Sequence, residues 1–94
     1  MSDVPRVLVV DDDPVARAAI SGLLRRRYEV VTAATADEAL TAFKEQRFDV
    51  ALVDVMLPDR DGCALTEQVR ALPRGAKVPI LIISGRRSFA TRKK

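Results

Sequence analysis

Three aspartates are the residues of this sequence best suited to chemistry. Asp11 and Asp12 follow one apolar run, and Asp54 ends another. Carboxylates that lie close together repel one another unless protons or a cation neutralise them. Hard oxygen ligands suit Mg2+, which keeps several waters and takes further ligands from a phosphate group. Because a carboxylate can also attack phosphorus as a nucleophile, the three residues predict magnesium-dependent phosphoryl transfer if the fold brings them together.

The segments around these aspartates alternate between strand and helix patterns. Short apolar, β-branched runs predict strands at residues 6–10, 28–33, 48–54 and 79–84. Helical spacing predicts helices that open at Asp13-Pro14, at a Thr35/Glu38 capping box and at Cys63, the first ending near residues 25–27 and the third at Leu72. In the first helix, the predicted inner face consists of Ala16, Ile20, Leu23 and Leu24.

This alternation predicts an α/β fold with a doubly wound parallel sheet and right-handed crossovers. If the second and third strands lie on opposite sides of the first, the strand order is 2-1-3-4. The first helix then covers one face of the sheet, and the next two helices cover the other. The first and third strands become neighbours at a topological switch point, where ligands bind at the carboxyl ends of the strands. Asp11, Asp12 and Asp54 are expected at those ends.

Composition narrows the classes of function. The chain of 94 residues is 48% apolar, which fits one folded domain, and no apolar run is long enough to span a membrane. The absence of histidine excludes histidine acid–base catalysis and a phosphohistidine carried by this chain. A single cysteine, Cys63, cannot form an internal disulfide, so we expect a cytoplasmic location.

The charge of the chain is unevenly distributed. Five of the 16 basic residues lie within residues 86–94, which we expect to form a solvated, disordered tail. We do not expect direct nucleic-acid binding, because Phe89 alone offers that tail a stacking surface. Among the acidic residues, Asp59 and Asp61 are expected on a loop surface rather than as metal ligands.

Three segments together resemble the receiver domain of two-component response regulators. They are Val9-Val10-Asp11-Asp12-Asp13-Pro14, the run from Leu52 to Gly62, and Ile82-Ile83-Ser84-Gly85. The resemblance implies a flavodoxin-like fold and a single receiver-like domain over residues 1–94, with a core at about 6–85. It also implies a phosphoacceptor rather than an enzyme, which takes its phosphoryl group from a histidine kinase or a histidine phosphotransfer protein.

The resemblance assigns a role to each matching residue. Asp54 would accept the phosphoryl group, and Ser84 would hydrogen-bond one of its oxygens. Mg2+ would be held by Asp12 and Asp54 directly, by Asp11 through water and by the backbone carbonyl of Met56. Pro58 and Gly62 would shape the loop into the third helix, with Gly62 supplying conformational freedom.

The sequence departs from the family pattern after Gly85. A receiver continues with a fourth helix, a fifth strand ending in an active-site lysine, and a fifth helix, none of which we find before Lys94. We therefore expect a C-terminally truncated receiver whose fourth strand is an apolar edge. The chain then either self-associates through this strand or is a loosely packed monomer of low thermal stability. The alternative function is a remnant that cannot switch and acts only as a protein-interaction piece.

Overall fold

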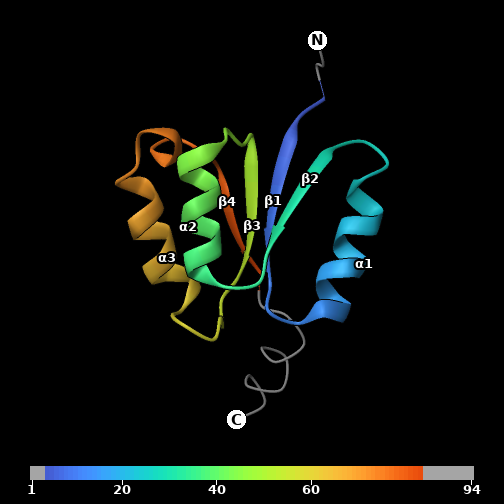
Figure 1. Ribbon diagram of the computed structural model, residues 1–94, viewed down its shortest axis with the longest axis horizontal. Helices are drawn as coiled ribbons and strands as arrows, with labels where there is room; N and C mark the ends of the chain where they lie inside the picture. The colour runs from blue at the N-terminus through green and yellow to red at the C-terminus, as the bar shows by residue number, and fades with distance from the viewer. Residues whose placement is uncertain (1–3, 84–94) are drawn as a thin grey trace.

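The computed structural model describes residues 4–83 and arranges them around a four-stranded parallel sheet (Figure 1). The elements are β1 (Arg6–Val10), α1 (Pro14–Leu24), β2 (Glu29–Ala33), α2 (Ala36–Glu45), β3 (Val50–Asp54), α3 (Gly62–Arg70), the 3-10 turn η1 (Pro73–Gly75) and β4 (Ile80–Ile83). The strand order is β2-β1-β3-β4, with every pair parallel. The predicted flavodoxin-like topology is confirmed.

The helices form two layers, with α1 on one face of the sheet and α2 and α3 on the other (Figure 1). Alternate residues of β1 serve the two faces, because successive side chains of a strand point in opposite directions. Leu8 and Val10 join the core under α2 and α3, whereas Val7 and Val9 join the smaller core under α1. The strand β1 is therefore covered on both sides, as its near-continuous apolar run predicted.

The described helices begin at side-chain caps. Asp13 accepts hydrogen bonds from the N–H groups of Val15 and Ala16 at the start of α1, where Pro14 takes the first helical position. Thr35 caps α2 by accepting from the N–H of Glu38, as expected. The Glu38 carboxylate, however, reaches back to the N–H of Ala34, one residue beyond the predicted capping-box partner.

The predicted inner face of α1 is partly wrong. Leu23 is 72% exposed, while Ser21 is buried with 5% exposure. Ile20 and Leu24 do pack on the sheet. At about 100° per residue, Ser21 lies on the flank of the Ile20–Leu24 stripe and Leu23 lies on the opposite flank. The face of α1 that packs on the sheet is thus shifted toward Ser21, so a polar residue lies between the helix and the sheet.

The third predicted helix is shorter than expected. It ends at Arg70 rather than Leu72, and the chain then turns into η1 at Pro73. Proline restricts the residue before it to extended backbone, which accounts for the early end. The described part of β4 ends at Ile83. Ser84 and the predicted tail at residues 86–94 lie outside the described residues.

Within residues 4–83, β4 pairs only with β3. Ile80 packs against the core under α2 and α3, but Leu81 is 55% exposed and Ile82 is 40% exposed. In this part of the chain, no helix is long and apolar enough to cross a bilayer.

Candidate metal centre

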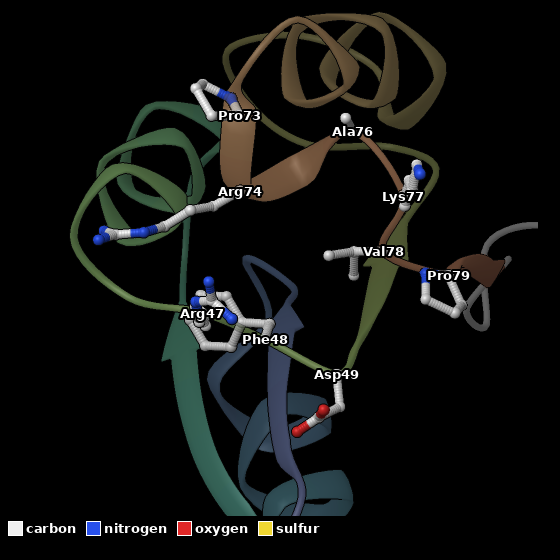
Figure 2. A pocket seen from close by; sticks show the side chains of 9 residues that line it. All are labelled: Arg47, Phe48, Asp49, Pro73, Arg74, Ala76, Lys77, Val78 and Pro79. Carbon is white, nitrogen blue, oxygen red and sulfur yellow. The ribbon is translucent and has the colours of Figure 1, made fainter.

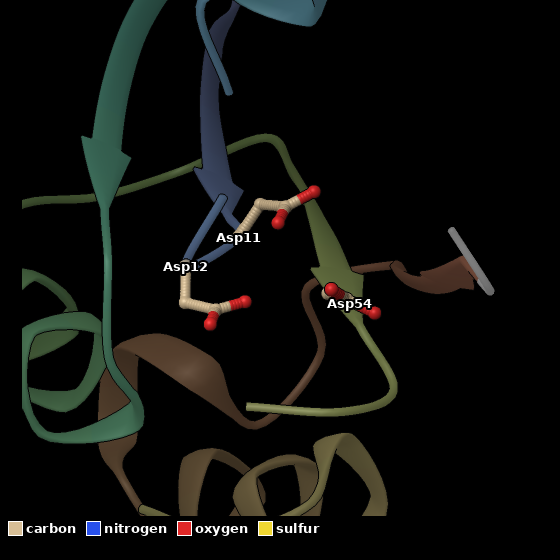
Figure 3. Close-up of side chains that lie close together, drawn as sticks. All are labelled: Asp11, Asp12 and Asp54. Carbon is tan, nitrogen blue, oxygen red and sulfur yellow. The ribbon is translucent and has the colours of Figure 1, made fainter. Parts of the chain in front are cut away.

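Three carboxylates meet at the carboxyl ends of the two central strands. Asp11 and Asp12 directly follow β1, and Asp54 is the last residue of β3. The register pairs Val10 with Val53, so the two strand ends lie side by side. One carboxylate oxygen from each aspartate lies within 4.8 Å of the others, and Figure 3 shows the three side chains gathered at this edge.

Burial makes it energetically unfavourable for Asp11 and Asp54 to carry negative charge. Asp11 is 3% exposed and Asp54 is 8% exposed. Desolvation raises the pKa of Asp11; the hydrogen bond from Asp13 lowers it, and the negative charges of Asp54, Asp12 and Asp13 raise it further. A cation held between the three groups would remove this repulsion.

Backbone contacts hold the cluster in place. The N–H of Asp13 donates to Asp11 Oδ1 over 3.0 Å, and the N–H of Met56 donates to Asp54 Oδ1 over 3.2 Å. On the other side, the guanidinium of Arg17 in α1 donates to the backbone carbonyl of Asp11 over 2.8 Å. The carboxylates are therefore fixed by the loops that follow β1 and β3.

An all-oxygen set of this kind fits a hard divalent cation. Asp59 and Asp61, which we did not expect as ligands, are not part of the cluster. Met56 lies beside Asp54 and its side chain is 48% exposed, so the side chain is not buried at the centre.

Gly62 has a different role from the one expected. Among the described residues no glycine has a positive φ, so conformational freedom does not explain this position. A Cβ at Gly62 would lie 2.9 Å from the backbone oxygen of Asp54 and 3.1 Å from the Cα of Val55. Glycine is therefore needed because the start of α3 packs directly against the backbone at Asp54.

Two loop residues have a role that the sequence did not predict. The Asp59 carboxylate accepts hydrogen bonds from the N–H groups of Ala36 and Asp37, at 2.9 and 3.0 Å. Arg60 donates to Asp37 and to Gln68, both at 2.6 Å. The contacts with Ala36 and Asp37 tie the β3–α3 loop to the start of α2, whereas the contact with Gln68 ties it to α3. No local pattern signals them.

Asp61 is the N-cap of α3, and its carboxylate accepts from the N–H of Ala64 over 2.8 Å. Here a signal was available, because an aspartate directly before a helical pattern favours the cap position. The prediction of a loop-surface residue did not recognise this capping role.

A pocket of about 660 Å³ lies at the opposite end of the strands (Figure 2). Phe48, Val78 and two prolines line it, together with Arg47, Arg74, Lys77 and Asp49. The residues before β3 and β4 form it, so it is separated from the carboxylates by the length of the sheet.

The structure thus combines a doubly wound parallel sheet with an acidic cluster at the topological switch point of that sheet. Residues 7–94 match the response regulator receiver domain. The chain therefore belongs to the receiver domains of response regulators, which serve two-component signalling.

The chain is similar to whole regulators over part of their length. It is 39% identical over 92 residues to the transcriptional regulatory protein AruR of Pseudomonas aeruginosa. That alignment covers 92% of this chain and 36% of AruR. It is 38% identical over 89 residues to PrrA of Mycobacterium tuberculosis, covering 94% of this chain and 37% of PrrA. The chain thus spans about a third of the length of these two relatives.

Solved structures agree with the fold. The receiver domain of a Pseudomonas aeruginosa sensor histidine kinase, with magnesium coordinated in its active-site cleft, aligns with a TM-score of 0.84 and 32% identity, covering 97% of this chain and 75% of that one. The chemotaxis response regulator CheY4 of Vibrio cholerae aligns with a TM-score of 0.83 and 34% identity, covering 96% and 76%.

Proposed function

We propose that Asp54 accepts a phosphoryl group from a histidine kinase or a histidine phosphotransfer protein in a Mg2+-dependent reaction. The observation that carries this proposal is the approach of Asp11, Asp12 and Asp54 to within 4.8 Å at the ends of adjacent strands. The magnesium ion in the similar receiver domain from Pseudomonas aeruginosa supports the choice of metal.

Each residue has a separate task in this proposal. Asp12 and Asp54 would hold the metal directly, Asp11 would act through water, and Met56 would contribute its backbone carbonyl. When bound, Mg2+ neutralises charge on the carboxylates and on the phosphoryl oxygens. A carboxylate oxygen of Asp54 attacks phosphorus, the phosphorus–nitrogen bond of the donor phosphohistidine breaks, and an aspartyl phosphate forms.

The contacts of Asp54 suit a nucleophile. Its Oδ1 accepts the N–H of Met56, which fixes the carboxyl group and leaves the second oxygen without a hydrogen bond from the described residues. Gly62 keeps the adjoining backbone free of a side chain. We assign Ser84, which lies outside the described residues, to a hydrogen bond with a phosphoryl oxygen.

Acetyl phosphate, a small phosphodonor, tests this proposal without the partner kinase. Intact-mass measurement is expected to show one added phosphoryl group in the presence of Mg2+ and none after chelation. Asp54→Asn should abolish the addition. Asp61→Asn is the matched control, because asparagine caps a helix as well as aspartate does and the residue lies outside the cluster. Unchanged phosphorylation of the Asp54→Asn protein would reject the assignment.

We also propose that two copies of this chain associate along β4. The support is the half-exposed pair Leu81 and Ile82 on a strand that, within residues 4–83, pairs on one side only. Such an edge offers backbone groups for pairing and apolar area for burial.

A further inference from the structure

A further pocket lies between α1 and the outer strand β2, and none of the three clustered aspartates lines it. Its volume is about 330 Å³, and it is lined by Pro14, Arg17, Ala18, Ser21, Gly22, Arg25 and Thr32. The charged residues of this lining, Arg17 and Arg25, are both cations. A site with two guanidinium groups and no carboxylate in its wall favours an anionic ligand.

Ser21 adds an unsatisfied donor to this wall. The residue is buried, with 5% exposure, and its Oγ has no hydrogen-bond partner in the described part of the chain. A buried hydroxyl without a partner is unfavourable, and native structures normally satisfy such groups. Because a serine hydroxyl can donate to an anion, a ligand oxygen at this position would satisfy it.

The spacing along α1 aligns the polar groups. Arg17, Ser21 and Arg25 follow one another at intervals of four residues, which places them on one face of the helix. Arg17 and Arg25 are separated by about 12 Å along the helix axis, with Ser21 midway between them. Two long side chains can reach one small anion, or the two ends of a diphosphate, across that distance.

The two arginines differ in how they are held. Arg17 is fixed by its hydrogen bond to the carbonyl of Asp11. The guanidinium of Arg25 has no hydrogen bond or ion pair with the residues from 4 to 83, although the residue lies at the C-cap of α1. Because only the backbone of Arg25 takes part in capping the helix, its guanidinium remains available to a ligand.

Thr32 on β2 and Gly22 on α1 form the remaining wall and the open edge of the pocket. Thr32 pairs in register with Val9, whose side chain lies in the core under α1, so Thr32 faces the same helix. At Gly22, an added Cβ would meet nothing within 4 Å, which leaves the rim of the pocket open.

We propose that this pocket binds an oxyanion of the phosphate type, with Arg17, Arg25, Ser21 and Thr32 as donors. The site is separate from the aspartate cluster and does not depend on the function proposed for Asp54. Both orthophosphate and pyrophosphate are probes of its chemistry, and comparison of the two shows whether one phosphate or two fill it.

The test is titration of the full chain, followed by amide chemical shifts in Mg2+-free buffer at constant ionic strength. Saturable shifts are expected at Ser21, Gly22, Arg25 and Thr32. Arg25→Gln should weaken binding about tenfold, because a charge-assisted hydrogen bond is lost. Arg26→Gln is the matched control, since Arg26 is an exposed neighbour that does not line the pocket, and its affinity should not change.

A second pair of variants tests the pocket itself. Gly22→Glu places a carboxylate at the open rim and should abolish binding, whereas Gly22→Gln, of the same shape without charge, should bind nearly as the parent does. Ser21→Ala should weaken binding a few-fold without loss of thermal stability, because no internal hydrogen bond is removed. Shifts that never saturate, or equal losses for Arg25→Gln and Arg26→Gln, would overturn the proposal and indicate general attraction to a basic surface.

Discussion

The Asp59 carboxylate accepts a hydrogen bond of 2.9 Å from the backbone N–H of Ala36, which lies 23 residues earlier in the sequence. Ala36 is the first residue of α2, and Asp59 lies in the loop between β3 and α3. The loop that follows β3 is thus attached to a helix N-terminus, where a negative charge is favourable.

Replacing Asp59 is therefore expected to destabilise the fold. Asp59→Ala removes two acceptors from the start of α2 and should lower the free energy of unfolding by about 1 kcal/mol. The hydrogen bond from Ala36 is the main reason that the pKa of Asp59 lies below its usual range. Because the folded pKa is lowered, the stabilisation is present above the ordinary pKa and is lost as pH falls through the folded value.

Urea unfolding of both proteins from pH 7 down to pH 3 measures this difference. The gap between the parent and Asp59→Ala should be widest at neutral pH and should narrow in acid. Glu67→Ala is the control, because Glu67 is an exposed carboxylate with no hydrogen bond or ion pair in the described part of the chain. A gap that stays constant with pH would contradict the role of the charge.

Two glycines should respond in opposite directions to the same substitution. Gly62→Ala puts a methyl group 2.9 Å from the backbone oxygen of Asp54 and should destabilise the fold by about 1–3 kcal/mol. Gly22→Ala meets open space on α1 and should stabilise it by about 0.5 kcal/mol. Thermal unfolding of the two variants beside the parent measures both changes, and a harmless Gly62→Ala would argue against the close backbone contact.

The charges of the aspartate cluster should provide affinity for Mg2+ while lowering the stability of the metal-free protein. Asp12→Asn removes one negative charge from a site where like charges repel, so the metal-free protein should be as stable as the parent or more stable. Its affinity for Mg2+ should fall at least about tenfold, because the ligand set loses charge. Calorimetric titration with Mg2+ and thermal unfolding without it provide the two readouts.

Asp61→Asn is the control for that experiment. It retains the cap of α3, and Asp61 is outside the three-carboxylate group and is not among the charges that act on Asp11. A marked loss of metal-free stability in Asp12→Asn would show that Asp12 is structural rather than a ligand.

Association along β4 predicts a concentration dependence that one substitution removes. Leu81→Lys should shift the sedimentation coefficient toward that of the monomer, because a charge on an edge strand opposes pairing. Leu23→Lys, at a leucine of 72% exposure on α1, should leave association unchanged. Sedimentation of the parent as a monomer at all concentrations would reject the proposed interface.

The sequence was sufficient for the features that depend on local periodicity. Alternating apolar runs predicted the strands, and Asp13-Pro14 predicted the start of α1. The crossover rule alone did not fix the strand order, which we had to suppose and which the structure confirms. The convergence of Asp11, Asp12 and Asp54 followed from the topology, because parallel strands bring their carboxyl ends to one edge.

The features that were missed depend on rotation and on distant contacts. Leucine is more apolar than serine, yet the register of α1 on the sheet buries Ser21 and exposes Leu23. The bond between Asp59 and Ala36 joins segments that no local pattern relates. Gly62 was correctly singled out, but the steric reason appears only when the backbone of Asp54 is placed beside it.

Unlike charges gather at the two ends of the central strands in the described part of the chain. Three carboxylates occupy the ends of β1 and β3, while three cations and the single carboxylate of Asp49 line the pocket at the starts of β3 and β4; the cations are Arg47, Arg74 and Lys77. A charged partner approaching in solution experiences a torque before it touches the surface, so productive orientations are favoured early in the encounter. The rate of that encounter will fall as added salt shortens the Debye length, even when the contacts of the final complex remain unchanged.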